Sequence, residues 1–136
     1  MIYLDTSAAM KLVRPEQYSA DLSRWFDERQ PVAVLSSVLI EVELVRATRR
    51  SAPERLARVA DVLRGVGVVT VSPAVIVRAA GYDNRDLRSL DAVHLATAEH
   101  LVSATHQALQ AFVGYDERLL AAARAVGLPV AAPGLF

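Results

Sequence analysis

The sequence opens with "MIYLDTSAAMKLV", residues 1–13, in which a single acidic residue joins an apolar run to a helical pattern. The run Met1–Leu4 is short and apolar, which indicates a buried strand, and it ends at Asp5. Residues Thr6–Val13 then favour a helix that stops before Pro15. A strand that passes directly into a helix is typical of the first unit of an α/β fold.

Strand and helix patterns alternate along the rest of the chain. We expect further strands in "VAVLS" after Pro31, over Val66–Val71, in "QAFVGY" and, as a short edge strand, over Pro129–Ala132. We expect helices over Ser19–Arg29, from a cap at Ser36 or Ser37 to Arg50, from Pro53 to Gly65, from Ser72 to Ala80, from a cap at Ser89 to Ser103, and from Glu117 to Val126. This alternation predicts one domain over residues 1–136, a three-layer α/β/α sandwich with a largely parallel sheet.

The composition of the chain excludes several kinds of functional site. The chain contains no Cys, which excludes disulfides, thiolate metal sites and a Cys nucleophile. No apolar run approaches the roughly 18 residues of a membrane span, and an acid stands where a signal peptide carries basic residues, so we expect a cytoplasmic protein. The net charge of zero counts mildly against a nucleic-acid partner, because many such proteins carry a strongly positive field.

Four acidic residues stand near the ends of expected strands or in the helices that follow. Asp5 ends the first strand and Asp116 follows the strand in "AFVGY", so both point into the crevice beyond the carboxyl ends of a parallel sheet. Asp91 is expected in the first turn of its helix, and Glu43 about two turns into another. Taken singly, each acid also fits a structural role as a helix cap, a first-turn residue or, for Glu43, an ion pair with Arg46.

Taken together, the four acids point to a metal. Several like charges in one crevice repel one another and need a compensating cation. Oxygen ligands without thiolates favour Mg²⁺ or Mn²⁺ over zinc. Two such ions about 3.5–4 Å apart activate a water and stabilise the leaving oxygen when a phosphodiester is hydrolysed. The pattern therefore predicts a metal-dependent nuclease.

Four stretches covering nearly the whole chain carry a family resemblance. They are "MIYLDTSA", "SSVLIEVELVRATRR", "LRSLDAVHLATA" and "FVGYDERLLAAARAVGLPV". In this order and at these intervals they resemble the PIN-domain ribonucleases, and most closely the VapC-type toxins of bacterial type II toxin-antitoxin systems. The resemblance implies a PIN-like sandwich, in agreement with the expected alternation of strands and helices.

The resemblance also implies roles for individual residues. The acidic quartet that binds Mg²⁺ or Mn²⁺ and supports catalysis would be Asp5, Glu43, Asp91 and Asp116. Thr6 or Ser7 would support it by hydrogen bonds to a carboxylate or a metal-bound water. Glu41 remains an alternative to Glu43, because that helix is apolar nearly all round and its periodicity does not tell which acid faces inward.

Gly114 and the histidines need separate interpretation. Many relatives carry Thr or Ser at the position of Gly114, so the hydroxyl expected beside Asp116 is missing.

His94, three residues after Asp91, stands where a metal or acid-base role is conceivable, but we interpret it as a packed structural histidine. The other two histidines, expected at the surface or in loops, are His100 and His106.

The function implied by the resemblance is an endoribonuclease toxin. It would hydrolyse structured RNA, a tRNA or a ribosomal RNA loop, through metal-activated water and leave 5′-phosphate and 3′-hydroxyl ends. A VapB-type antitoxin would cover the site and bind operator DNA, and a homodimer is usual in the family. The helices from Val38 to Leu63 offer a surface for either protein partner. The arginines that would contact RNA phosphates or a partner's acids, unless they form only a solvated helix face, are Arg46, Arg49, Arg50 and Arg88.

Two other functions compete with this interpretation. A haloacid-dehalogenase-like phosphatase also places an Asp after its first strand, but it needs a second acid two residues on, where this chain has Ser7. A degenerate PIN-like or receiver-like binding module would lack catalysis. A receiver uses a lysine late in the chain, whereas the only lysine here is Lys11. The four acids favour the enzyme.

Overall fold

The computed structural model describes residues 1–136 and has a five-stranded, all-parallel sheet at its centre. The strands are β1 (Ile2–Leu4), β2 (Val34–Ser37), β3 (Gly67–Val69), β4 (Ala111–Val113) and β5 (Val130–Ala131). Their order across the sheet is β3-β2-β1-β4-β5. The first strand of the chain therefore lies in the middle, and the residue that follows it comes out at the centre of the sheet's carboxyl edge.

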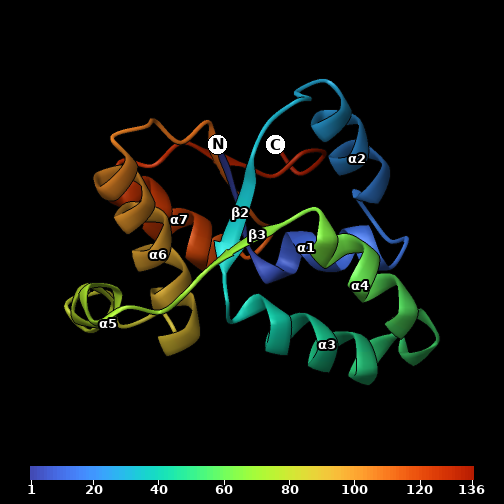
Figure 1. The fold of residues 1–136 in the computed structure, drawn as a ribbon, viewed down its shortest axis with the longest axis horizontal. Coiled ribbons are helices and arrows are strands. Elements are labelled where there is room, and N and C mark those ends of the chain that lie inside the picture. The colour runs from blue at the N-terminus through green and yellow to red at the C-terminus, as the bar shows by residue number, and fades with distance from the viewer.

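Helices cover both faces of the sheet. They are α1 (Thr6–Val13), α2 (Ser19–Asp27), α3 (Ile40–Ser51), the 3₁₀ turn η1 (Pro53–Arg55), α4 (Leu56–Arg64), α5 (Pro73–Ala80), α6 (Ser89–Thr105) and α7 (Glu117–Ala125). Figure 1 shows α1 to α4 on one side of the sheet and α6 and α7 on the other, with α5 packed against α6. The predicted three-layer α/β/α sandwich is confirmed.

The alternation of side chains along β1 explains how the two faces are filled. Ile2 and Leu4 belong to the core formed with α1 to α4, whereas Tyr3 belongs to the core formed with α6 and α7. All three residues are fully buried, as expected for a central strand of a parallel sheet. Phe112 of β4 stacks on Tyr3 with ring centroids 5.0 Å apart, which fixes the tyrosine ring in the second core.

The start of α3 differs from the prediction. Ser36 and Ser37 were expected to cap this helix, but both are buried residues of β2, and Ser37 is the last residue of that strand. The helix begins at Ile40, and the hydroxyl of Ser37 accepts the N–H of Leu39 (3.2 Å) instead of capping it. Glu43 consequently lies in the first turn of α3, close to the edge of the sheet, and not two turns along.

Two further boundaries also differ. Ser89 is the first residue of α6 and Arg88 is its N-cap, so the prediction of a serine cap was wrong. The strand expected over Val66–Val71 pairs only over Gly67–Val69, because β3 is an exposed edge strand with one neighbour. None of the helices is long and apolar enough to cross a membrane.

Candidate active site

The four acids predicted from the sequence all lie at the edge of the sheet where the parallel strands end. Asp5 follows β1 and caps the N-terminus of α1, and Asp116 follows the neighbouring strand β4 and caps α7. Asp91 lies in the first turn of α6 and Glu43 in the first turn of α3. Two strand ends and two helix starts thus deliver the acids to one edge, where α/β proteins place their functional sites.

One carboxylate oxygen of Asp5 accepts two hydrogen bonds. Its Oδ1 accepts the N–H of Ala8 (3.0 Å) and the hydroxyl of Ser7 (2.7 Å), and only 4% of the residue is exposed. The Ser7 hydroxyl also accepts the N–H of Tyr115 (2.7 Å) and so ties the residue after β1 to the loop after β4. Ser7 therefore makes the kind of carboxylate contact predicted for it, while Oδ2 of Asp5 has no hydrogen-bond partner in the protein.

Glu43, and not Glu41, faces the interior. Its Oε1 accepts the hydroxyl of Thr6 (3.1 Å) and lies 2.6 Å from Nε2 of His94, whereas Glu41 is exposed. The ion pair with Arg46 that offered a structural explanation for Glu43 does not form. His94 is packed, as expected, with 1% exposure, but its contact with Glu43 was not predicted.

The same one-sided pattern recurs at Asp116. Its Oδ1 accepts the N–H groups of Arg118 (3.0 Å) and Leu119 (3.1 Å), which leaves Oδ2 without a partner. Asp91 makes no hydrogen bond within the protein and is half-buried. Asp5, Glu43 and Asp116 therefore each accept hydrogen bonds through one carboxylate oxygen and leave the other free, whereas both carboxylate oxygens of Asp91 are free.

The acids also act on one another electrostatically. Burial raises the pKa of Asp5 to about 6, and the charge of Asp91 adds to this effect. Burial, together with the negative charges of Asp116 and Glu43, raises the pKa of Asp91. The charges of Asp116 and Glu43 thus act on Asp91, and the charge of Asp91 acts on Asp5. Such crowding disfavours full ionisation unless a cation is present.

The donor set fits a hard divalent cation. Carboxylate oxygens without thiolates are the ligands that Mg²⁺ and Mn²⁺ prefer, and every acid of the quartet offers at least one free oxygen. In this arrangement no three Asp, Glu or His side chains converge closely enough to hold an ion. Ligation therefore requires side-chain rotation, for which Asp91 is free because no hydrogen bond restrains it.

Gly114 has a packing role that the sequence did not reveal. A Cβ atom added at this position would lie 3.0 Å from the Cγ and both carboxylate oxygens of Asp5. The absence of a side chain therefore lets Asp5 pack directly against the end of β4. The hydroxyl that Gly114 lacks is not needed to hold the loop, since Ser7 already accepts the N–H of Tyr115.

We expect Gly114→Ala to weaken Mn²⁺ binding by about 10-fold, because the added methyl must displace the Asp5 carboxylate by a few tenths of an ångström. Isothermal titration calorimetry measures this effect. Gly65→Ala is the matched control, because its Cβ would meet only an ordinary contact at 3.5 Å. Equal affinities in both variants would show that the close packing of Asp5 does not matter for the metal.

Comparison with known proteins agrees with this geometry, since residues 2–125 match the PIN domain. The chain belongs to the PIN domain family. It is 46% identical over 134 residues to Ribonuclease VapC35 of Mycobacterium tuberculosis, covering 98% of both chains. It is also 38% identical over 137 residues to Ribonuclease VapC47 of the same organism, again covering 98% of both. The predicted resemblance to VapC-type PIN ribonucleases is thereby confirmed.

Solved structures show the same PIN fold at lower sequence similarity. The crystal structure of VapC20 from Mycobacterium tuberculosis, described as a sarcin-ricin loop cleaving toxin, superposes with a TM-score of 0.70 at 21% identity and covers 90% of this chain and 95% of that one. A toxin-antitoxin complex from Klebsiella pneumoniae gives a TM-score of 0.66 at 17% identity, with 98% of both chains covered. These likenesses support the fold.

Proposed function

We propose that this PIN domain is an Mg²⁺- or Mn²⁺-dependent endoribonuclease toxin whose metal is held by Asp5, Glu43, Asp91 and Asp116. The observation that carries the proposal is the set of free carboxylate oxygens at one edge of the sheet, where burial and neighbouring acids raise the pKa values of Asp5 and Asp91. The ribonuclease names of the relatives at 46% and 38% identity support the reaction class.

The residues of this chain have separable tasks in such a reaction. Ser7 and the N–H of Ala8 hold Asp5, the N-terminus of α7 holds Asp116, and Thr6 holds Glu43. Bound among these acids, a divalent cation would activate a water for attack on phosphorus and neutralise the charge on the leaving 3′-oxygen. Without a cation, the same acids would repel an RNA phosphate, so we expect cleavage to depend strictly on metal.

Arginines that form no ion pair line two hollows, which we propose as surfaces for RNA. Arg46, Arg49 and Arg50 of α3 line a hollow of about 200 Å³, on the helix that also carries Glu43. Arg88 and Arg118 line a second hollow, of about 500 Å³, together with Asp116 and Glu117. The five arginines form no ion pair with a carboxylate, so their charges are available to phosphates. A structured RNA is the proposed substrate, and the sarcin-ricin loop cleavage ascribed to VapC20 supports a ribosomal loop as one candidate beside tRNA.

Replacing the three α3 arginines together with Ala should weaken RNA binding and raise KM, with kcat nearly unchanged. The slope of log affinity against log salt should fall by about 1 for each phosphate that no longer meets an arginine. A matched triple variant of ion-paired arginines, Arg24→Ala with Arg64→Ala and Arg78→Ala, is the control. Fluorescence-anisotropy titrations of a tRNA at several salt concentrations measure the slopes. Equal slopes in both triple variants would show that the α3 arginines do not contact the RNA.

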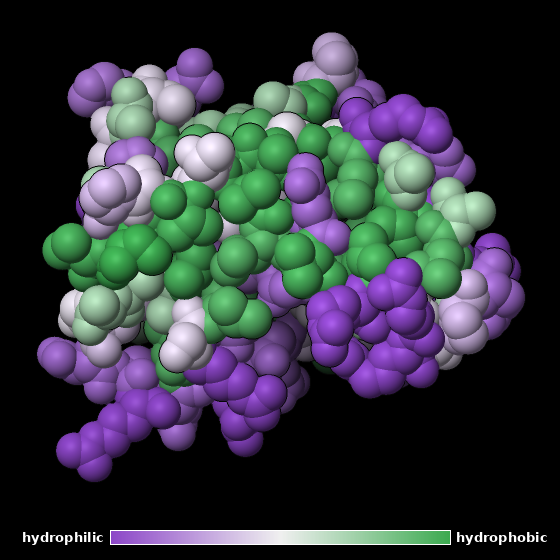
Figure 2. Space-filling view, turned by 60° about the horizontal axis from the view of Figure 1, so that its bottom comes forward, coloured by the Kyte–Doolittle hydropathy of each residue, from purple (hydrophilic) through white to green (hydrophobic).

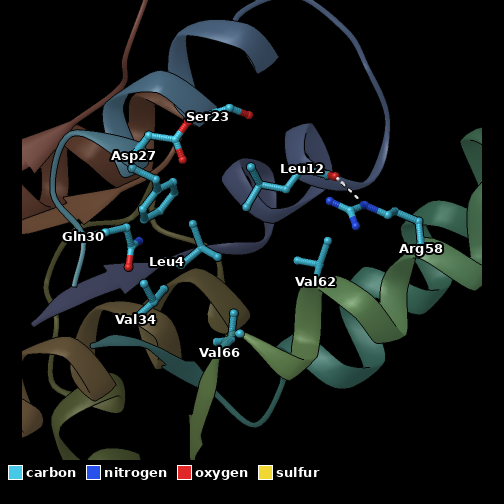
Figure 3. A pocket seen from close by; sticks show the side chains of 11 residues that line it. Leu4, Leu12, Ser23, Asp27, Gln30, Val34, Arg58, Val62 and Val66 are labelled. Atoms are coloured by element: carbon cyan, nitrogen blue, oxygen red, sulfur yellow. Dashed lines mark hydrogen bonds between the residues drawn. The ribbon is translucent and has the colours of Figure 1, made fainter. Parts of the chain in front are cut away.

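A VapB-type antitoxin is part of the proposal, and an apolar groove offers one surface for it. The groove lies among β1, β2, α1, α2 and α4 and has a volume of about 240 Å³ (Figure 3). Its apolar lining includes Leu4, Leu12 and Val62, and Arg58 and Asp27 stand at its sides. None of the four metal-binding candidates lines it, so an antitoxin seated there must extend along the surface to cover the active site. Operator DNA would then be bound through the antitoxin.

A homodimer is also proposed, and an exposed apolar area supports it. Figure 2 shows a broad apolar area on the side where α3 and α5 come forward. The large apolar residues exposed on α3, β3, α5 and the start of α6 are Val42, Val68, Ile76, Val77 and Leu90. Single exposed apolar residues are normal on a protein surface, whereas a broad apolar area marks an interaction site. The predicted cytoplasmic location remains a prediction.

Incubation with total tRNA and ribosomal RNA tests the proposed function. With Mg²⁺ or Mn²⁺ we expect discrete fragments that disappear with EDTA and carry 5′-phosphate and 3′-hydroxyl ends. The mapped ends would name the substrate. Intact RNA of both kinds, in the presence of metal and with a folded protein, would favour a catalytically degenerate PIN-like module that acts through protein contacts.

A further inference from the structure

A buried chain of hydrogen bonds runs from the sheet to the active site and has no part in the function proposed above. His94 lies on α6, one turn after Asp91, and is 1% exposed. Its Nδ1 lies 2.8 Å from the hydroxyl of Tyr3 in the central strand β1, and its Nε2 lies 2.6 Å from Oε1 of Glu43. The imidazole thus connects the middle of the sheet to a carboxylate on α3.

The surroundings of Tyr3 set the direction of this chain. The N–H of Ser37 donates to the Tyr3 oxygen at 3.0 Å, so that oxygen already accepts one hydrogen bond. A phenol is protonated at neutral pH, so the hydroxyl of Tyr3 keeps a proton to donate. The phenol proton then points to Nδ1 of His94, which must accept. With Nδ1 accepting, the ring proton is on Nε2, which donates to Glu43.

The chain of hydrogen bonds is anchored in the buried centre of the sheet. Tyr3 is fully buried, stacks on Phe112 at 5.0 Å and meets the His94 ring edge-on at 5.9 Å. Glu43, in contrast, comes from a helix start that has no side-chain cap. Without His94, its carboxylate would keep only the hydrogen bond from Thr6 at 3.1 Å. The orientation of Glu43 thus depends largely on the imidazole.

Both donors to Glu43 converge on the same oxygen. Thr6 and His94 bond to Oε1, and no protein group bonds to Oε2. We propose that His94, itself oriented by Tyr3, is a positioning residue that fixes Glu43 through Oε1 and thereby presents Oε2 to the divalent cation. This inference rests on the proposed role of Glu43 as a metal ligand. Hydrogen-bonded partners of metal ligands commonly change metal affinity by about 10–100-fold when they are removed.

The tautomer of His94 tests the direction of the chain without any metal. Long-range ¹H–¹⁵N NMR spectra distinguish a proton on Nε2 from one on Nδ1, and the variants His100→Gln and His106→Gln assign the signals of the other two histidines. We expect His94 to carry its proton on Nε2 alone. In Tyr3→Phe, which keeps the ring but loses the hydroxyl, we expect a mixture of tautomers. A proton on Nδ1 in the wild type would overturn the proposed chain.

Mn²⁺ affinity tests the positioning role. Calorimetry should show binding about 10–100-fold weaker in His94→Ala and only slightly weaker in His94→Gln, whose amide can donate to Glu43 and accept from Tyr3. Rescue by Gln but not by His94→Leu, which fills a similar volume without polar atoms, is a result that a purely packing role would not produce. His100→Ala, on the same helix, is the control and should bind Mn²⁺ as the wild type does.

Tyr3→Phe keeps the test decisive if His94→Ala fails to fold, since the phenyl ring preserves the packing against Phe112. We expect it to fold and to bind Mn²⁺ several-fold more weakly, within the range seen for such partners. Wild-type affinity in every folded variant at these two positions would overturn the positioning role while leaving the nuclease proposal intact. If Glu43→Gln instead bound Mn²⁺ with wild-type affinity, Glu43 would not be a metal ligand, and the positioning role of His94 would be wrong as well.

Discussion

Asp91→Asn should abolish metal-dependent RNA cleavage, with a loss of more than about 100-fold, while the protein folds as the wild type does. Asp91 is the acid whose pKa is raised by burial and by the charges of both Asp116 and Glu43, so it lies at the electrostatic centre of the site. It makes no hydrogen bond, so its loss leaves no buried donor unsatisfied. Gel analysis of RNA fragments and a thermal unfolding curve measure the two effects.

Asp61→Asn is the matched control for this variant. Asp61 is an exposed helical acid paired with Arg64 on α4 and takes no part in the site. Purified by the same procedure, it should cut RNA at the wild-type rate, and its contrast with an inactive Asp91→Asn excludes a contaminating nuclease as the source of the fragments. If Asp91→Asn yields the same fragments at the same rate as Asp61→Asn, the assignment of Asp91 to catalysis is wrong.

Asp5→Asn should remove activity to a similar extent and yet stabilise the metal-free protein at neutral pH. Burial raises the pKa of Asp5 to about 6 from an ordinary 3.8, so the folded state binds this proton more tightly than the unfolded state. The free energy by which the protonated Asp5 carboxyl stabilises the folded state is fully present below pH 3.8 and is lost as the pH rises through about 6. At neutral pH the ionised carboxylate therefore destabilises the fold, by an amount on the order of 2–3 kcal/mol. Asn keeps an oxygen that can accept the N–H of Ala8.

Urea unfolding in EDTA at several pH values checks this prediction. The wild type should gain stability as the pH falls from neutral to about 5, and Asp5→Asn should show a smaller gain, since the raised pKa of Asp91 acts in the same direction. Added Mn²⁺ should reverse the order by stabilising the wild type more than the variant. Lower stability of Asp5→Asn than of the wild type in EDTA at neutral pH would contradict the electrostatic account.

Much of this fold could be predicted because its signals are local. Apolar runs such as that before Asp5 indicate buried parallel strands, and Pro73 marks the start of its helix. Helix starts without a capping side chain were less predictable. The start of α3 at Ile40 depends on how far β2 continues in the sheet, and this tertiary effect misplaced Glu43 by about one turn.

The candidate site was predictable where the acids follow strands and less so elsewhere. Asp5 and Asp116 follow apolar runs, and parallel pairing necessarily brings those ends together. Periodicity could not choose between Glu41 and Glu43, because the contacts that decide it come from α1 and α6. The link to His94 was missed for the same reason. A polar atom such as the hydroxyl of Tyr3 inside an apolar strand indicates that a partner is needed, but the sequence does not say which.

We propose one divalent metal centre, held by Asp5, Glu43, Asp91 and Asp116. The most direct measurement is anomalous diffraction from a crystal of this protein soaked in Mn²⁺, which locates the metal without reference to activity. We expect Mn²⁺ density bounded by these four carboxylates, with Asp91 turned towards it and Glu43 still bonded to His94 through Oε1. Mn²⁺ density only elsewhere on the protein, or none at this edge of the sheet at a saturating concentration, would contradict it.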